Sequence, residues 1–370
     1  MSLLAFAYIA FIGLGLPDPL PGALWPVLRP DYGLPASALG ALLLAVSTGT
    51  MMASLVAGRA IQALGTGGVL ALSVGLTALA ALGAATAPPW PVLVALALLS
   101  GLGAGAVDAA MNLFAAARFA PRHLNWMHAC WGVGATLSPA VAAGLLATGA
   151  SWRAAYAVVG VALAALALGF LLTRSRWGGP AAEAGGPRLS AFAVLRNPQA
   201  RRQALAFFFY CGVEAGTGQW LATILVESRG ADPASAGAAT TLFWASLAIG
   251  RVVLGFVVDR MGPDRLVLRA VLASALFSAG FALLPGGAGI ACAALLAVAL
   301  APLYPTLMAR TPARLGAAAA AHAVGFQVAA ATLGAGTLPA LLGLAPIGWV
   351  PGLLAVMAVG LALLIRRILR

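Results

Sequence analysis

The sequence predicts an all-α membrane protein of twelve transmembrane helices in two pseudo-symmetric six-helix halves. Three observations lead to this prediction: the composition, a single polar interruption near the middle of the chain, and a correspondence between its halves. Hydrophobic residues make up 62% of the chain and charged residues 8%, and the mean hydropathy is +1.00. Such a chain has too little polar surface to cover a soluble globule. Because one helical span needs about 20 apolar residues, 370 residues have room for about twelve.

The apolar stretches, taken in order, define the expected spans. In the first half they lie at about 3–28, 38–60, 68–88, 90–117, 124–148 and 152–173. In the second half they lie at about 204–227, 235–257, 266–284, 288–309, 316–342 and 346–365. The first stretch has no basic start and no small-residue cleavage site, so we expect it to remain as a helix and not to be removed as a signal peptide.

One polar segment divides the chain near its midpoint. Residues 174–203 contain Gly-Gly-Pro, Glu-Ala-Gly-Gly-Pro and several arginines. We therefore expect an N-terminal half at 1–173, a cytoplasmic linker at 174–203 and a C-terminal half at 204–370. Such short connections leave no room for a sizeable soluble domain.

The arginines predict the orientation. The even-numbered turns, the linker and the tail hold Arg59, Arg118, Arg122, Arg174, Arg176, Arg188, Arg196, Arg201, Arg202, Arg260, Arg265, Arg310, Arg314, Arg366, Arg367 and Arg370. The odd-numbered turns hold only Arg29, Arg153 and Arg229. By the positive-inside rule both termini and the linker are expected in the cytoplasm of a multi-pass inner-membrane protein. The net charge of +12 then reflects topology, and we expect a lipid bilayer and no nucleic acid as partner, with the protein a monomer.

Three acids lie inside the apolar stretches, in spans 1, 4 and 7: Asp18, Asp108 and Glu214. None has a basic neighbour in mid-membrane, and acids in hydrocarbon usually face the bundle interior and mark function. Because desolvation disfavours a charged carboxylate, all three are candidates for carrying protons. Spans 3, 6, 9 and 12 contain no interior acid, and we expect them to face lipid.

Asp108 lies beside a run of glycines at positions 101, 103 and 105. Glycines of this kind let another backbone come close. Asn112 follows four residues later on the same helical face, so the alternative role for this pair is a helix-to-helix hydrogen bond. Asp18 lies among prolines and would alternatively cap a broken helix.

The two halves correspond at an offset of about 197 residues. Gly58 to Gly65, after span 2, aligns with Gly255 to Gly262, after span 8, and Asp18 falls on Glu214 near the same offset. Two acids at equivalent places in two repeats suggest a pseudo-twofold site between the halves.

Catalysis and metal binding have no support in the sequence. There is no His-Glu-x-x-His pair, no Gly-x-Ser-x-Gly elbow and no Cys/His spacing typical of a metal site. The three cysteines are far apart in apolar runs, which favours reduced packing residues. We expect no enzyme, no cofactor and no metal.

Several motifs resemble a known family. Gly255-x-x-x-Asp259-Arg260-x-Gly262-x-x-Arg265 resembles the cytoplasmic signature of the major facilitator superfamily. A narrower set resembles its fucose permease and sodium-glucose-transporter-like sugar branch: Gly105-x-x-Asp108-x-x-x-Asn112, Asn125-x-x-His128-x-x-x-Gly132, Tyr210-x-Gly212-x-Glu214, Phe243-Trp244 with Gly250-Arg251, and Pro302-Leu303-Tyr304-Pro305.

The resemblance implies an alternating-access transporter in which acids of helices 1 and 4, here Asp18 and Asp108, couple protons to sugar uptake. It also implies a gating role for Asp259, Arg260, Arg265 and Arg251. The first-half copy of the signature departs from the pattern, because Gln62 and Ala63 stand where the family has an acid and an arginine.

A sugar needs hydrogen-bonding groups and an aromatic platform. The candidate hydrogen-bonding residues are Asn112, Asn125, His128, Glu214, Gln219 and Gln327, and the candidate platforms are Trp131, Trp220 and Trp244. His128 and Gln327 would alternatively be packing or helix-contact residues. The coupling ion is expected to be H⁺, although carboxylate and amide oxygens would also hold Na⁺. The alternative function is proton-driven efflux of amphipathic small molecules on the same fold.

Overall fold

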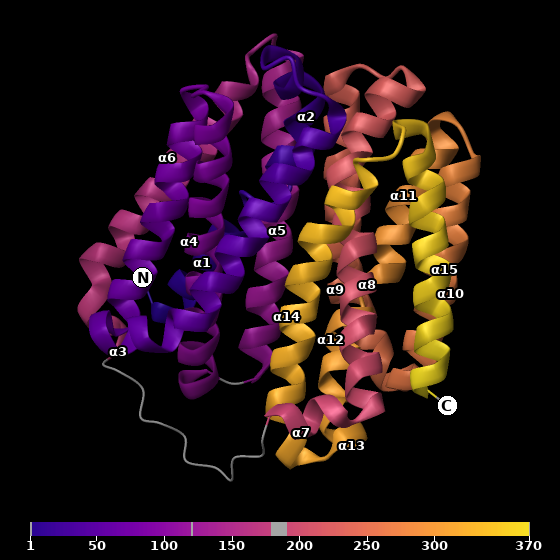
Figure 1. The fold of residues 1–370 in the computed structure, drawn as a ribbon. Coiled ribbons are helices and arrows are strands. Elements are labelled where there is room, and N and C mark those ends of the chain that lie inside the picture. The colour runs from indigo at the N-terminus through magenta and orange to yellow at the C-terminus, as the bar shows by residue number, and fades with distance from the viewer. Residues whose placement is uncertain (1, 120, 179–190, 370) are drawn as a thin grey trace.

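The computed structural model describes residues 2–119, 121–178 and 191–369, and the described part is helical without strands. The predicted linker, 174–203, lies partly outside these ranges. Figure 1 shows the two halves side by side, with the first in indigo to magenta and the second in rose through orange to yellow. We call the end that holds α7 (Ala191–Arg196), α13 (Thr311–Leu315) and the end of α15 the lower end, and the opposite one the upper end.

The first half contains six spans. The first is broken into α1 (Leu3–Gly15) and α2 (Leu20–Asp31). After a short 3-10 turn, η1 (Ala36–Ala38), come α3 (Leu39–Ala85), α4 (Trp90–Arg118), α5 (Pro121–Ala147) and α6 (Trp152–Thr173), and the 3-10 turn η2 (Arg174–Trp177) follows.

The second half repeats this plan. After α7 come α8 (Pro198–Thr223), the π-helical turn η3 (Ile224–Ser228), α9 (Pro233–Met261) and α10 (Pro263–Leu283). The next span is broken into α11 (Gly286–Leu300) and α12 (Leu303–Ala309), and α13, α14 (Ala317–Leu342), the 3-10 turn η4 (Ile347–Trp349) and α15 (Val350–Leu369) complete the chain.

The prediction of twelve spans is confirmed. Ten helical segments of the described residues are long and apolar enough to cross a membrane. One of them, Ala36–Ala85, has 50 residues, which is about 75 Å at about 1.5 Å per residue and more than twice a bilayer core of about 30 Å. It folds back at Gly65, whose φ of 70° breaks the helix, and so provides two spans. The twelfth is α8, which carries Arg201, Arg202 and Glu214.

The glycine run of α4 allows the close packing expected from the sequence. A Cβ on Gly101 would lie 2.0 Å from the carbonyl oxygen of Val46, and one on Gly103 would lie 2.2 Å from Oγ1 of Thr77. Since Val46 and Thr77 lie on the two arms of α3, both arms pack directly against the backbone of α4. Helix α4 is thereby held against both arms of α3.

The two halves touch at the upper end. Arg29 at the end of α2 forms an ion pair with Glu227 of η3 at 2.7 Å between Nη2 and Oε1. A Cβ on Gly40 would lie 3.0 Å from the Cβ of Ala340, and one on Gly237 would lie 3.0 Å from the Cβ of Ala143. These contacts join α2, α3 and α5 of the first half to η3, α14 and α9 of the second.

The halves are apart at the lower end. Gly58 and Gly255 occupy equivalent positions in the two repeats, and a Cβ on either would meet no atom within 4 Å among the described residues. Nearby, Leu55 and Phe256 are 83% and 74% exposed. The space between the halves is therefore closed above and open below.

Candidate functional site

A cavity of about 280 Å³ lies between the halves, above the level of Gly58 and Gly255. Its polar end is formed by Asp18, Glu214, Gln219, Trp131 and Trp244. The break between α1 and α2 contributes Asp18, α5 contributes Trp131, α8 contributes Glu214 and Gln219, and α9 contributes Trp244. The structure thus brings both pseudo-equivalent acids to one cavity.

Asp18 is connected to both halves. The indole N–H of Trp131 donates a hydrogen bond to Oδ2 of Asp18 at 3.0 Å. The backbone carbonyl of Asp18 accepts a second hydrogen bond, from Nε2 of Gln219, at 2.7 Å. That carbonyl is free to do so because helix α1 ends at Gly15 and α2 begins at Leu20, and a helix break leaves backbone groups without intrahelical partners.

Glu214 is paired with a buried arginine, contrary to the sequence-based expectation that the membrane acids lack basic partners. Oε2 of Glu214 lies 3.2 Å from Nη2 of Arg251 on α9, and the hydroxyl of Tyr210 donates to the same carboxylate oxygen. The carboxylate and the guanidinium are 37 positions apart in sequence, so their contact depends on the packing of α8 against α9. Arg251, predicted as a gating residue, therefore lies in the middle of the bundle.

Trp131 joins these two groups. Its indole donates to Asp18, and the guanidinium of Arg251 lies 5.1 Å from the centre of its ring, a cation–π distance. Trp131 also meets Trp244 edge to face, with 5.9 Å between ring centroids. A continuous chain of contacts therefore runs from Asp18 through Trp131 and Arg251 to Glu214.

Two polar atoms on the cavity wall are buried without a partner among the described residues. They are Oε1 of Gln219, an acceptor, and Nε1 of Trp244, a donor. Buried polar groups are normally hydrogen-bonded. Neighbouring backbone covers both groups, since Oε1 of Gln219 packs against Gly22 and the indole of Trp244 packs against Gly218. A side-chain rotation is therefore needed to bring either group to a bound solute.

Asp108 and Asn112 lie away from this cavity lining. Nδ2 of Asn112 donates to Oδ1 of Asp108 at 2.8 Å within α4. The two residues are four positions apart on one face of the same helix, so this bond is not the helix-to-helix hydrogen bond that the sequence offered as the alternative role. The polar end of the cavity relies instead on Asp18 and Glu214.

The remaining candidate residues are dispersed. Trp220 is fully buried, and its indole N–H donates to the carbonyl of Pro339 at 2.8 Å, so it fastens α8 to α14. His128 packs edge to face against Phe11 at 5.1 Å between ring centroids. The side chain of Asn125 lies outside the described residues.

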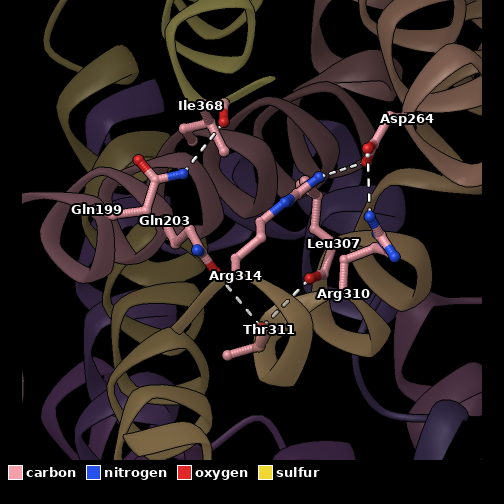
Figure 2. A network of polar contacts seen from close by, with 8 residues as sticks. All are labelled: Gln199, Gln203, Asp264, Leu307, Arg310, Thr311, Arg314 and Ile368. Carbon is pink, nitrogen blue, oxygen red and sulfur yellow. Dashed lines mark hydrogen bonds and ion pairs between the residues drawn. The ribbon is translucent and has the colours of Figure 1, made fainter. Parts of the chain in front are cut away.

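A separate polar network lies at the lower end of the second half (Figure 2). Oδ1 of Asp264 lies 2.6 Å from Nη2 of Arg314, and Oδ2 lies 3.4 Å from Nη2 of Arg310. Beside it, the hydroxyl of Thr311 donates to Oε1 of Gln203 at 3.4 Å, and Gln327 joins by donating from Nε2 to Oε1 of Gln203 at 2.8 Å. Gln327 thus lies in this network and not on the cavity wall.

The predicted gating residues are mostly solvent-facing. Asp259, Arg260 and Arg265 are exposed at the lower end. Within the described part of the chain the signature region forms its ion pairs through Asp264, a residue that sequence reasoning overlooked although it directly precedes Arg265. A gating role for Asp259, Arg260 and Arg265 stays a prediction.

Comparisons with known proteins agree with this architecture. The family model of the Major Facilitator Superfamily matches residues 1–339. Bypass of stop codon protein 6 of Saccharomyces cerevisiae is 24% identical over 280 residues, which cover 68% of this chain and 56% of that protein. The chain therefore spans about half the length of this curated relative.

Two solved structures share the fold. A mutant of the nucleoside transporter NupG has a TM-score of 0.80 at 15% identity, with 100% of both chains covered. The fucose:proton symporter FucP of E. coli has a TM-score of 0.67 at 18% identity, with 99% of this chain and 98% of that chain covered. At such identities the likeness establishes the arrangement of helices.

Proposed function

Because the chain belongs to the major facilitator superfamily, we propose that it is a proton-coupled symporter of a sugar or similar small polar solute, working by alternating access. The observation that carries this proposal is that Asp18 and Glu214 line one cavity from opposite halves. In transporters built from repeats, substrate and ion sites lie near the bilayer midplane at the repeat interface. The two acids occupy such a place.

The chain of contacts provides a route from protonation to movement. An ionised Asp18 accepts a charge-assisted hydrogen bond from Trp131, and such bonds are about twice as strong as neutral ones. Protonation of Asp18 weakens that bond and frees the indole, which also supports Arg251. Because Arg251 and Glu214 belong to the second half, a proton on Asp18 alters a contact between the halves and can bias the equilibrium between their two arrangements.

The cavity offers what a hydroxylated solute requires. Once their side chains rotate toward the cavity, Oε1 of Gln219 can accept from a solute hydroxyl and Nε1 of Trp244 can donate to one; both are buried and unpaired in this conformation. The rings of Trp131 and Trp244 supply faces against which an apolar sugar or base surface can pack. The fucose:proton symporter and the nucleoside transporter of the same fold make sugars and nucleosides the first solutes to test.

The arginine distribution supports a cytoplasmic location for the lower end. Arg310 and Arg314 lie there beside Asp264, and the positive-inside rule applies to such short turns. With this orientation in a cell membrane the closed upper end faces outward, and the cavity opens to the cytoplasm. The conformation is then the inward-facing state of the cycle.

The test is a solute-evoked current from purified protein in liposomes on a solid-supported membrane, with equal pH on both sides and no sodium. We expect sugars or nucleosides to evoke an inward positive current that Asp18→Asn abolishes. The matched control is Asp232→Asn, because Asp232 caps α9 by accepting from the backbone N–H of Ser235 at 2.9 Å and asparagine caps equally well. A current that survives in Asp18→Asn would reject this acid as the coupling group, and a current that requires sodium would replace the proton.

Trp131→Phe separates binding from coupling. The change keeps an aromatic ring beside Arg251 but removes the indole N–H that Asp18 accepts, together with the pyrrole part of the ring. We expect uptake driven by a pH gradient to fall by about tenfold or more, since a hydrogen bond to a charged group is worth about 1.5–3 kcal/mol, while solute counterflow without a gradient persists. Equal losses in both assays would mean that Trp131 acts in solute binding alone.

The aliphatic share of the cavity lining favours a second candidate, proton-driven efflux of amphipathic molecules. Leu42, Leu43 and Val46 belong to that lining. The sign of the current distinguishes the two functions. Symport of a neutral solute with protons moves positive charge inward, whereas exchange of an entering neutral solute for protons moves positive charge outward. An outward positive current would select the antiporter.

A further inference from the structure

We propose that the aliphatic part of the cavity is a distinct compartment that binds an apolar substituent of the solute. The preferred substrates are then hydroxylated compounds that carry an apolar group, rather than bare monosaccharides. This inference rests on the proposed function, because the polar end described above holds the hydroxylated part. It adds the requirement that the solute carry an apolar group, which the polar end alone does not impose.

The compartment extends from the polar end into the upper part of the first half. Its walls are aliphatic side chains from three helices: Leu42, Leu43 and Val46 of α3, Leu93 and Leu96 of α4, and Val159 of α6. The α3 and α4 residues recur at helical spacing on one face of each helix, as expected for a continuous wall. The polar end and the compartment belong to one cavity.

The space exists because the second arm of α3 presents small residues to it. Ala80, Ala81 and Ala84 line the cavity. Ala80 and Ala84 are 4% and 3% exposed, and Val159 of α6 is 2% exposed. Since these residues are buried within the bundle, the space is internal and does not belong to the lipid-facing surface.

This arrangement departs from the expectation that spans 3 and 6 only face lipid. Spans 3 and 6 correspond to the second arm of α3 and to α6. Both contribute residues to the cavity, so the cavity extends past the helices at the contact between the halves and into the interior of the first half. The cavity is therefore deeper in the first half than the inter-half polar site requires.

The polar groups of the compartment do not favour an ionic guest. The hydroxyl of Thr50 donates to the carbonyl of Val46 at 3.0 Å, and the other hydroxyls on the wall are those of Ser100 and Tyr156. Among the described residues the cavity lining holds no arginine, and its two acids are Asp18 and Glu214 of the polar end; the lining residues from α3, α4 and α6 are uncharged. Burial of an unpaired charge against such a wall is unfavourable, so the bound substituent is neutral.

The test uses methyl, ethyl, propyl and butyl β-D-glucosides with the full-length protein in lipid nanodiscs. Binding is followed by thermal shift, and transport by the current assay in liposomes. We expect the half-saturating concentration for binding to fall by about fourfold with each methylene, the factor that corresponds to complete burial of one CH₂ group. A smaller but regular decrease would indicate partial burial in the same compartment.

Two variants locate the effect. Ala84→Leu adds bulk to the compartment wall and should remove the chain-length dependence, so that butyl glucoside binds no more tightly than methyl glucoside. Ala162→Leu makes the same change at an exposed position of α6 and should preserve the dependence. If filling the compartment lowers the binding of methyl glucoside as strongly as that of butyl glucoside, the compartment does not hold the alkyl group.

The outcomes separate this inference from the proposed function. Glucosides that bind and evoke currents regardless of chain length would overturn the compartment and leave symport intact. Chain-length-dependent binding without any current would support the compartment and refute symport of these solutes. Absence of binding across the whole series would overturn the compartment, because even the longest alkyl group would then gain nothing from it.

Discussion

Loss of either Glu214 or Arg251 alone should destabilise the protein strongly. Loss of both together should cost much less stability. Glu214 is 8% exposed, and Arg251 lies 3.2 Å from its carboxylate. Removal of one partner of a buried ion pair leaves an uncompensated charge and typically costs about 3–5 kcal/mol. Replacement of both partners by uncharged residues of similar size is often close to neutral. We therefore expect Arg251→Met to destabilise the protein strongly and Glu214→Gln/Arg251→Met to recover most of the loss.

The assay is the midpoint of thermal unfolding of purified protein, followed by the fluorescence of its tryptophans, for both single variants and the double variant. The double-mutant cycle gives the coupling between the two sites directly. Tyr210 also touches the pair, and its hydroxyl can still donate to the amide oxygen after Glu214→Gln. Arg251→Met, by contrast, removes the cation that lies over the ring of Trp131. Losses that simply add in the double variant would refute the reasoning, because independent sites have no coupling energy. A single variant as stable as the native protein would show that its remaining charge is solvated.

Three further predictions follow from the contacts. Gly101→Val should prevent α4 from packing on α3 and abolish stable folding, because a Cβ there meets the carbonyl oxygen of Val46 at 2.0 Å; a normal yield of monodisperse protein in size-exclusion chromatography would contradict it. Glu227→Gln removes the ion pair between Glu227 and Arg29, which is partly exposed, and such pairs are worth at most about 1 kcal/mol. The labelling rate of a cysteine introduced at the upper end should therefore rise up to about fivefold. An unchanged rate would show that the pair does not hold this end closed. The pKa of Asp232 is lowered by the side-chain and backbone hydrogen bonds with Ser235. The stabilisation from its carboxylate is therefore complete above the unfolded pKa of 3.8 and is lost as pH falls through the lower folded pKa. Asp232→Asn should remove this acid-dependent part of the unfolding profile, and an unchanged profile would show that Asp232 does not contribute to it.

Much of the fold could be predicted from the sequence because it depends on local patterns. The number of spans follows from apolar length, which a bilayer fixes at about 20 residues per helix. The break at Pro17 and Pro19 follows from the missing backbone N–H of proline, and it places Asp18 between α1 and α2. The approach of α3 to α4 follows from Gly101 and its neighbours, since glycine has no side chain to keep another helix away.

The sequence predicted the acidic residues of the site but not the residues that contact them. Asp18 and Glu214 could be selected as membrane acids at equivalent repeat positions, and both line the cavity. The partners of these acids could not be selected, because Trp131 is 113 positions from Asp18 and Arg251 is 37 positions from Glu214. Spacing within one helix says which residues share a face, but it does not say which helix that face meets.

The sequence by itself therefore determined that the protein is a twelve-helix membrane bundle of two related halves, with acids in its interior. Only the tertiary structure decided that Gln327 and Trp220 fasten helices together while Gln219 and Trp244 face the cavity. It also decided that the second arm of α3 and α6 extend the cavity into the first half. The physical reason is that a cavity is the space left after all helices have packed, so its shape and chemistry depend on every rotation and contact in the bundle and on no single stretch of chain.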